Sequence, residues 1–210
     1  MNLTKNNNIV ITGEISSDFE FSHSVAGEDF YIFTLRSVRM SGNPDMIQVI
    51  TSDRIFDVAR NLKGLFVSIS GELRSHDYDD ETGNHLKVFV FAKEIEFIEE
   101  FQCTNKKYDK NSISMKGYIC KPPIYRKTPM GREIADLLLA VNRPYGKSDY
   151  IPCICWGRNA LYASSFDVGT KVSVSGRVQS RIYNKWTSEN EFEERTTYEV
   201  SVQSLEVCAE

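Results

Sequence analysis

The stretch VSVSGRVQSRIY at residues 172–183 has a counterpart 105 positions earlier, VSISGELRSHDY at residues 67–78. Both read Val-Ser-hydrophobic-Ser-Gly, with a Ser four positions after the Gly and a Tyr three positions beyond that. Apolar and polar residues alternate along both stretches, which is the period of a half-buried β-strand. A Gly within a long alternating strand usually marks a bulge or a barrel bend, so we expect one at Gly71 and one at Gly176.

The similarity extends beyond this strand. IVITGEIS at residues 9–16 matches ISMKGYIC at residues 113–120 at an offset of 104, and Arg39 matches Arg143 at the same offset. The offset grows to 110 where residues 95–96 meet residues 205–206. Steps of this kind, at polar segments, are typical of a duplicated domain with loop insertions. The sequence predicts two domains and a polar linker, at residues 1–100, 112–210 and 101–111 respectively.

Each copy is predicted to be mostly strand. In the second copy the segments are residues 113–119, 134–141, 150–156, 171–183 and 196–207. GRNALYASSF at residues 157–166 is predicted to form a short helix. Five strands in about 100 residues, with a helix between the third and fourth, is the order of an OB fold. We therefore predict an all-β protein made of two tandem OB-fold barrels, each a five-stranded Greek key with a short helix between strands 3 and 4.

Charge is distributed unevenly along the chain. The net charge is −4, but residues 1–104 contain 9 Lys and Arg against 17 Asp and Glu, a net of −8. Residues 105–185 contain 15 basic against 5 acidic residues, a net of +10. Such asymmetry suggests that the second copy has a polyanionic partner, although uneven surface decoration gives the same pattern.

The third and fourth strands of the second copy show which side chains point outward. If Cys153 and Cys155 face the core, Tyr150 and Trp156 lie on the opposite face. Aromatic rings interleaved with cations are typical of surfaces that bind single-stranded nucleic acid, because bases stack on rings and cations contact phosphates. By the same alternation, the outward residues of the fourth strand are Arg177, Gln179, Arg181 and Tyr183. The first hairpin and the loop before the third strand add Arg126, Lys127, Arg132, Tyr145 and Lys147.

The first copy keeps the inward pattern and loses most of the outward one. Trp156 aligns with Ser52, and Tyr150 with Met46. We therefore expect the second copy to bind nucleic acid, and the first to serve as a structural, dimerisation or protein-contact barrel. Tyr78 is retained opposite Tyr183, which leaves some stacking in the first copy open.

No cofactor, metal site or catalytic site is predicted. Cys153 and Cys155 alternate with Ile and fit buried core thiols better than metal ligands. HDYDDETGNH at residues 76–85 fits a solvated acidic turn better than a Ca²⁺ or transition-metal loop. No nucleophile, phosphate-binding or zinc motif is present, so the chain is not expected to be an enzyme.

The sequence also indicates the compartment. No apolar run reaches the length of a membrane helix, and the first ten residues lack a secretory signal pattern. Five cysteines without framework spacing fit reduced thiols. We expect a cytoplasmic protein without a membrane partner.

Taken in order, NRPY, DYIPCICWGRNA, GTKVSVSGRVQSRIY and TTYEVSVQSLEV resemble the bacterial single-stranded DNA-binding protein family. The resemblance covers residues 112–207 closely, with residues 6–100 as a diverged second copy. Family patterns of the type L-A-V-N-R and aromatic-Gly-basic end here at Arg143 and Arg158. The resemblance implies base stacking on Tyr150, Trp156 and Tyr183, with a further aromatic near Tyr145.

Two departures from the family shape the expectation. The usual member has one OB domain per chain and forms a tetramer, so two copies per chain imply a homodimer of four barrels. The chain also stops after the last strand, without the family's Gly/Pro-rich tail and acidic tip. We predict a sequence-independent single-stranded DNA-binding protein of replication, recombination or repair. The alternative is an adaptor that resembles primosomal replication protein N, whose acidic first domain contacts replication or repair proteins.

Overall fold

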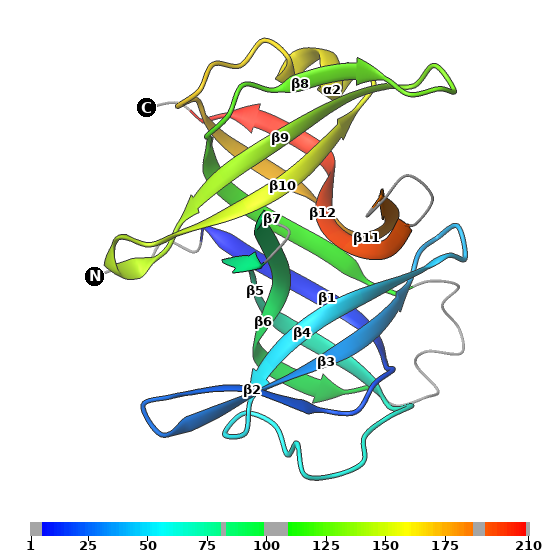
Figure 1. Ribbon diagram of the computed structural model, residues 1–210, viewed down its shortest axis with the longest axis vertical. Helices are drawn as coiled ribbons and strands as arrows, with labels where there is room; N and C mark the ends of the chain where they lie inside the picture. The colour runs from blue at the N-terminus through cyan, green and yellow to red at the C-terminus, as the bar shows by residue number, and fades with distance from the viewer. Residues whose placement is uncertain (1–5, 81–82, 99–108, 187–191, 209–210) are drawn as a thin grey trace.

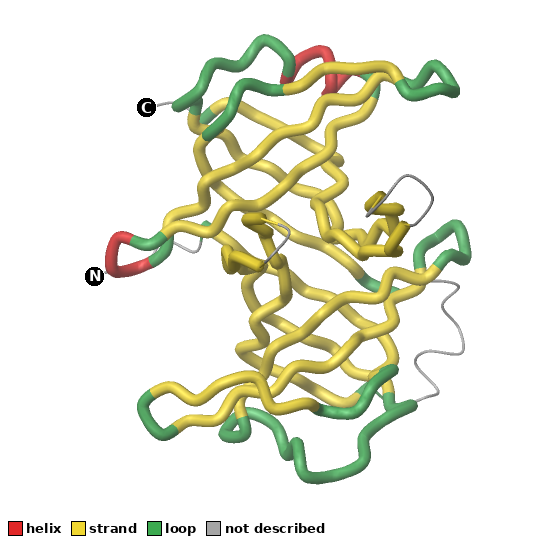
Figure 2. The backbone as a smooth tube through the Cα atoms, viewed as in Figure 1, coloured by secondary structure: helices red, strands yellow, loops and turns green. Residues whose placement is uncertain are grey.

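The computed structural model describes residues 6–80, 83–98, 109–186 and 192–208, which are mostly β-strand, as predicted (Figures 1 and 2). The first half, residues 6–98, contains β1 (Asn7–Ile15), β2 (Glu20–Val25), β3 (Glu28–Val38), β4 (Pro44–Ser52), β5 (Phe66–Asp80) and β6 (Gly83–Phe97). The second half, residues 109–208, contains β7 (Asn111–Ile119), β8 (Ile124–Lys127), β9 (Glu133–Asn142), the 3₁₀ turn η1 (Pro144–Gly146), β10 (Ser148–Trp156), α2 (Arg158–Ala163), β11 (Lys171–Trp186) and β12 (Phe192–Val207). No helix in these described ranges is long and apolar enough to cross a membrane.

Five strands of each half pair in a closed ring. In the first half β1 pairs with β3 and β5, β3 with β4, and β5 with β6, all antiparallel, and the parallel pair β4–β6 closes the ring. The corresponding ring of the second half is β7, β9, β10, β12 and β11. The hairpin strands β2 and β8 pair on the outside of β3 and β9. Each ring therefore has five strands, as predicted for each barrel, and each half has one further strand, β2 or β8, that was not among the predicted segments.

The predicted helix is present in the second half and absent from the first. α2 is built on small residues, with Ala160 and Ala163 fully buried. The corresponding residues 53–65 of the first half form turns, so the prediction of a helix there was wrong. The side chains of Asp57 and Asn61 each accept a hydrogen bond from the backbone N–H two residues on, at 3.3 and 3.2 Å. Such local bonds favour turns over a helix.

Gly71 and Gly176 are at bulges, as predicted. The register of β5 on β6 shifts between Ser70 and Gly71, and that of β11 on β12 between Ser175 and Gly176. A Cβ on either glycine would lie 2.2 Å from a carbonyl oxygen of the partner strand, that of Phe91 or of Ser201. Only a residue without a side chain allows the two strands to approach this closely.

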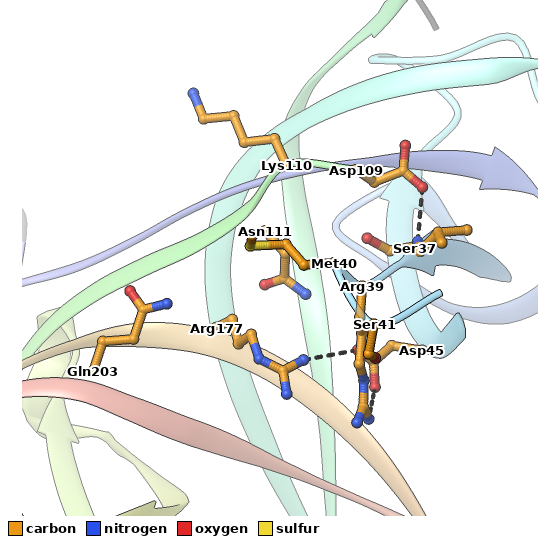
Figure 3. A pocket seen from close by; sticks show the side chains of 11 residues that line it. Ser37, Arg39, Met40, Ser41, Asp45, Asp109, Lys110, Asn111, Arg177 and Gln203 are labelled. Atoms are coloured by element: carbon orange, nitrogen blue, oxygen red, sulfur yellow. Dashed lines mark hydrogen bonds and ion pairs between the residues drawn. The ribbon is translucent and has the colours of Figure 1, made fainter. Parts of the chain in front are cut away.

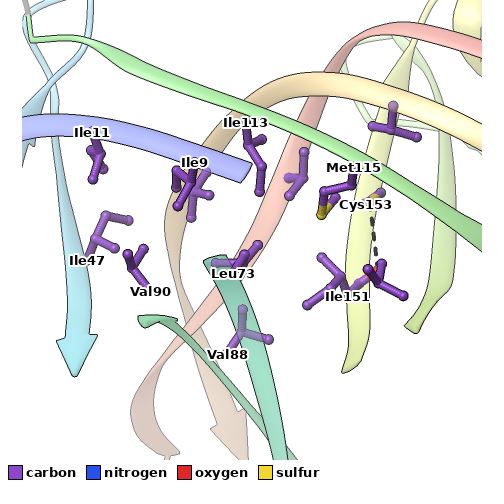
Figure 4. Packing of buried hydrophobic residues seen from close by; sticks show 14 of the residues in the cluster. Ile9, Ile11, Ile47, Leu73, Val88, Val90, Ile113, Met115, Ile151 and Cys153 are labelled. Atoms are coloured by element: carbon purple, nitrogen blue, oxygen red, sulfur yellow. Dashed lines mark hydrogen bonds between the residues drawn. The ribbon is translucent and has the colours of Figure 1, made fainter. Parts of the chain in front are cut away.

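The two halves are joined edge to edge by β1 and β7, which makes all twelve strands one sheet. The two strands run antiparallel, with Asn7 opposite Met115 and Ile11 opposite Asn111. At the centre of this register Ile9 lies opposite Ile113, its own counterpart at the repeat offset of 104. The halves are therefore related by a pseudo-twofold axis between these two residues, like the subunits of an isologous dimer. Both isoleucines belong to a hydrophobic core that continues through both halves (Figure 4).

The same axis relates the polar contacts beside this strand pair. Asn7 exchanges two hydrogen bonds with the backbone of Leu73, and Asn111 does the same with Val178. Asp45, which is 1% exposed, accepts a hydrogen bond of 2.8 Å from the backbone N–H of Ser180 across the interface. Its counterpart Asp149, which is 0% exposed, accepts one of 2.7 Å from Ser75.

The predicted linker, residues 101–111, is described only in part. Residues 101–108 lie outside the described residues, and its last residue, Asn111, is the first residue of β7. Backbone bonds tie the residues before β7 to the first half, from the amide of Thr12 to the carbonyl of Lys110 and from the amide of Asp109 to the carbonyl of Val38.

We expect Gly176→Ala to lower the free energy of unfolding by about 1–3 kcal/mol, the range for forcing an extra methyl group into a packed site. The added Cβ meets the backbone of β12 rather than a side chain that can move aside. Urea unfolding followed by circular dichroism measures the change. Ser173→Ala on the same strand is the control, and equal stability of the two variants would contradict the bulge.

Candidate nucleic-acid interface

The alternation of β10 and β11 is as the sequence predicts for the core face. Ile151, Cys153 and Cys155 on β10 are buried, as are Val172 and Val178 on β11. On the opposite face Trp156, Tyr150 and Tyr183 are 37%, 39% and 37% exposed, so each ring is partly open to solvent.

One hollow of the second half brings several predicted residues together. Its volume is about 360 Å³, and its lining includes Trp156, Arg132, Arg177, Gln179 and Arg181. The other lining residues are Ile154, Ser180, Glu199, Ser201 and, from the first half, Arg39. We call this set the Trp156 hollow. It combines one large aromatic ring with four guanidinium groups and one carboxylate. Tyr183 lies next to it, with its ring centroid 5.9 Å from the guanidinium carbon of Arg181.

Two members of this set do not present free polar groups, contrary to the prediction that they point into solvent. Gln179 is 8% exposed and donates to the Glu199 carboxylate at 2.6 Å. Arg177 donates at 3.3 Å to Asp45 of the first half. Burial lowers the pKa of Arg177, as does the neighbouring Arg39 guanidinium, while Asp45 acts in the opposite direction. Arg177 and Gln179 therefore shape the hollow and the junction between the halves, and Arg132 and Arg181 are its more accessible cations.

Figure 3 shows the contact that holds Arg177, at the edge of a second hollow of about 500 Å³. The Arg39 guanidinium donates to Asp45 from Nε at 2.7 Å, and Arg177 reaches the same carboxylate. The hydrogen bond to Asp45 raises the pKa of Arg39, and burial acts against it. Asp109 closes the other side, where burial raises the pKa of its carboxyl although the backbone N–H of Val38 donates to it. The sequence assigned no role to Arg39, but its guanidinium donates both to Asp45 and to the backbone carbonyl of Ser180 in the second half.

Arg143, Tyr145 and Lys147 lie on the loop between β9 and β10, apart from the Trp156 hollow. Arg143 and Lys147 line a different hollow, most of which belongs to the first half. Arg143 is an ion-pair partner, with Nε 3.1 Å from an Asp149 carboxylate oxygen in a geometry that does not form a hydrogen bond. Burial raises the pKa of Asp149, and Ser75 and Arg143 oppose this. Tyr145 is 99% exposed with a φ of 64°.

The remaining predicted cations lie along the outer hairpin and the helix. Arg126 pairs with Asp136 at 2.7 Å, and Lys127 lies 3.7 Å from Glu133. Both pairs are exposed, so solvent screens them and each cation can exchange its partner for a phosphate at little cost. Arg158 is exposed at the first position of α2.

The cysteines behave as core residues. Burial raises the pKa of Cys155 to about 12 and that of Cys153 well above its ordinary value. In the part of the chain that the structure describes, no three His, Cys, Asp or Glu side chains come together as a metal site. The acidic stretch at residues 76–85 forms the ends of β5 and β6, with residues 81–82 outside the described residues.

Residues 110–208 match the model of the single-strand binding protein family. This half of the chain is thus similar to a single-strand binding family domain. This agrees with the resemblance noted in the sequence over residues 112–207.

Curated relatives of this family align with less than half of the chain. Single-stranded DNA-binding protein 2 from Listeria innocua serovar 6a is 34% identical over 103 residues, which are 46% of this chain and 64% of that protein. Single-stranded DNA-binding protein A from Bacillus subtilis is also 34% identical over 103 residues, 46% of this chain and 59% of that protein. The chain thus spans less than two thirds of the length of these relatives.

A solved structure matches both halves at once. The wild-type single-stranded DNA binding protein from Thermus aquaticus superposes with a TM-score of 0.74 over 97% of this chain and 93% of that one. The sequence identity is 20%, so the comparison concerns the fold. The arrangement of two rings in one chain is thus shared with that protein.

We expect Cys153 and Cys155 to resist a thiol reagent at pH 8 in the folded protein. Their raised pKa keeps them as thiols, and burial excludes the reagent, whereas reactivity needs an accessible thiolate. The measurement is the number of thiols modified before and after denaturation in urea. A gain of at least two thiols on denaturation is expected, and full modification of the native protein would contradict it.

Proposed function

We propose that the protein binds single-stranded DNA without reading its sequence, as a non-enzymatic binding protein of DNA replication, recombination or repair. The observation that carries this proposal is the Trp156 hollow, in which one partly exposed indole lies among guanidinium groups. A base stacked on an exposed aromatic ring contributes about 1–3 kcal/mol and is accepted whatever its identity. Cations beside the ring contact the phosphates on either side of that base.

The path of the DNA strand over the surface follows from the positions of the exposed cations and rings. Arg132 lies at the end of the β8–β9 hairpin, and Arg181 and Tyr183 follow along β11. The DNA strand would pass from the β8–β9 hairpin across Trp156 and continue along β11. Tyr150 and Arg158 are further contacts of the same half, as are Arg126 and Lys127 once their carboxylate partners are displaced.

We infer that each closed ring is an OB-fold barrel. The chain would then have two domains, one at residues 1–100 and one at residues 112–210. The closed five-strand pairing and the glycine bulge in the fourth ring strand of each half support this. We also propose a homodimer, which brings four barrels together, and a cytoplasmic location, which fits the free thiols of Cys120, Cys153, Cys155 and Cys208.

We expect Trp156→Ala to weaken binding of oligothymidylate by about 1–3 kcal/mol, because one stacking surface is lost. This corresponds to a dissociation constant larger by about 5- to 150-fold. Fluorescence anisotropy of a labelled oligonucleotide at low salt measures it. Tyr162→Ala removes an exposed ring on α2 that does not line the hollow and is the matched control. Unchanged affinity of Trp156→Ala would contradict the proposal.

We expect Arg132→Gln and Arg181→Gln to change the salt dependence of binding. For single strands, the slope of log K against log salt is about −0.7 for each phosphate contact, so each variant should make the slope shallower by about 0.7. Anisotropy titrations at several NaCl concentrations give the slope. Arg60→Gln, an exposed cation in the first-half turns, should leave it unchanged. A slope that shifts equally in all three variants would indicate only a general effect of net charge.

A further inference from the structure

The pseudo-twofold axis gives the Trp156 hollow a counterpart on the first half. This second hollow, of about 540 Å³, is lined by Ser22, His23, Ile50, Arg74, Ser75, His76, Lys87, Phe89, Phe91, Arg143 and Lys147. We call it the Phe91 hollow. Its position follows from the repeat, because Ile50 and Ser75 correspond to Ile154 and Ser180 of the Trp156 hollow. Each hollow also receives an arginine from the opposite half, Arg39 in one and Arg143 in the other.

The rings of the Phe91 hollow are at positions where the second half has none. On β6, Phe89 and Phe91 correspond to Glu199 and Ser201 of β12. Phe91 pairs with Glu72 of β5, and Ser201 pairs with Arg177, the counterpart of Glu72 on β11. On β3, Phe30 lies directly opposite Ser52, whereas in the second half Ile134 lies opposite Trp156. In the first half the large ring, Phe30, is thus on the strand next to the one that carries Trp156 in the second half, about 5 Å away across the sheet.

These rings form a continuous series of flat surfaces. The His23 and Phe30 rings are stacked, with centroids 4.9 Å apart and planes 9° from parallel. The Phe30 centroid lies 5.8 Å from that of Phe91, and the guanidinium carbon of Arg74 lies 3.7 Å above the Phe91 ring. The series therefore crosses from β2 through β3 and β6 to β5. Phe30 and Phe91 are half-buried and His23 is exposed, so the outer edge of the series is open to solvent.

The charge around these rings is positive although the first half is acidic. The lining contains the cations Arg74, Lys87, Arg143 and Lys147 and no Asp or Glu. Glu72, a carboxylate beside the lining, is hydrogen-bonded to Lys93 and Arg74. Burial alone would raise the pKa of Glu72, but these two hydrogen bonds lower it, so it is ionised and offsets part of their charge. Arg143 is paired with Asp149. Lys87 and Lys147 are exposed and have no ion-pair partner within the described ranges, so they are available as phosphate contacts.

We propose that the Phe91 hollow is a second binding surface for single-stranded DNA. Bases would stack on His23, Phe30 and the Arg74 guanidinium plane, and Lys87 and Lys147 would contact phosphates. Bases stack on guanidinium planes as they do on rings, so Arg74 extends the aromatic surface. The ligand class rests on the proposed function, but the binding residues are different from those of the Trp156 hollow.

The test exchanges residues of one half for their counterparts in the other. Phe91→Ser and Arg74→Gln introduce the residues found at Ser201 and Gln179, and the double variant should lose the first-half surface. All proteins carry Trp186→Phe, which leaves Trp156 as the sole tryptophan. Phe97→Ser with Lys63→Gln is the control, because it removes an exposed ring and a cation that do not line the hollow.

Two readouts separate the surfaces in the full chain. Calorimetry with an oligothymidylate of about ten nucleotides, within the site size of one OB barrel, counts the sites. Quenching of Trp156 fluorescence reports the second-half surface and shows that the variant is folded. We expect two sites per chain for the parent and the control, and one site with normal Trp156 quenching for the exchange variant. Trp156→Ala should retain the first-half site.

The outcomes distinguish this inference from the proposed function. One site in the parent, with no loss in the exchange variant, would overturn the inference and leave the proposed function in place. Lost sites in the exchange variant without Trp156 quenching in the parent would support the first-half surface and overturn the role of Trp156. Absence of any binding would overturn both.

Discussion

The structure depends on the antiparallel pairing of β1 with β7. The parts of β1 and β7 that do not pair with β3 and β9 would otherwise leave amides and carbonyls unpaired on one side, and here they pair with each other. The isoleucines of these parts join two cores into one. The buried carboxylates Asp45 and Asp149 add to this seam, because each accepts a hydrogen bond from a backbone amide of the opposite half. A buried charge without such partners is costly, so separating the halves at these carboxylates would lose both hydrogen bonds.

The predictions from sequence that were correct concern features set by local sequence patterns. The inward alternation along the ring strands and the two glycine bulges follow from a local pattern, and both are present in the structure. The short helix was predicted correctly where alanines favour it, at Ala160 and Ala163. It was wrong where Asp57 and Asn61 bond to their own backbone, because the strength of such local competition is not visible in a hydrophobic pattern.

The outward residues were harder to predict because their environment is made by the other half. Alternation correctly put Arg177 on the outer face, but the Asp45 that binds it comes from a strand more than a hundred residues away in sequence. Position-by-position alignment also compared Trp156 only with Ser52. The ring of the first half is on the strand opposite, at Phe30, and only the register of β3 on β4 reveals this. A search for aromatic residues at cross-strand neighbours, rather than at equal offsets, is the signal that would have found it.

The covalent link between the halves affects how the two binding faces can change by substitution. In a dimer of identical subunits every substitution appears twice, so a residue that suits one face is imposed on its symmetry mate. Here the axis between Ile9 and Ile113 relates positions that are encoded separately, and an arginine such as Arg143 can adapt to the neighbouring barrel without altering Arg39. The seam is also intramolecular, so its formation does not depend on protein concentration. One chain can thus keep the geometry of a symmetric pair while its two faces acquire different chemistry.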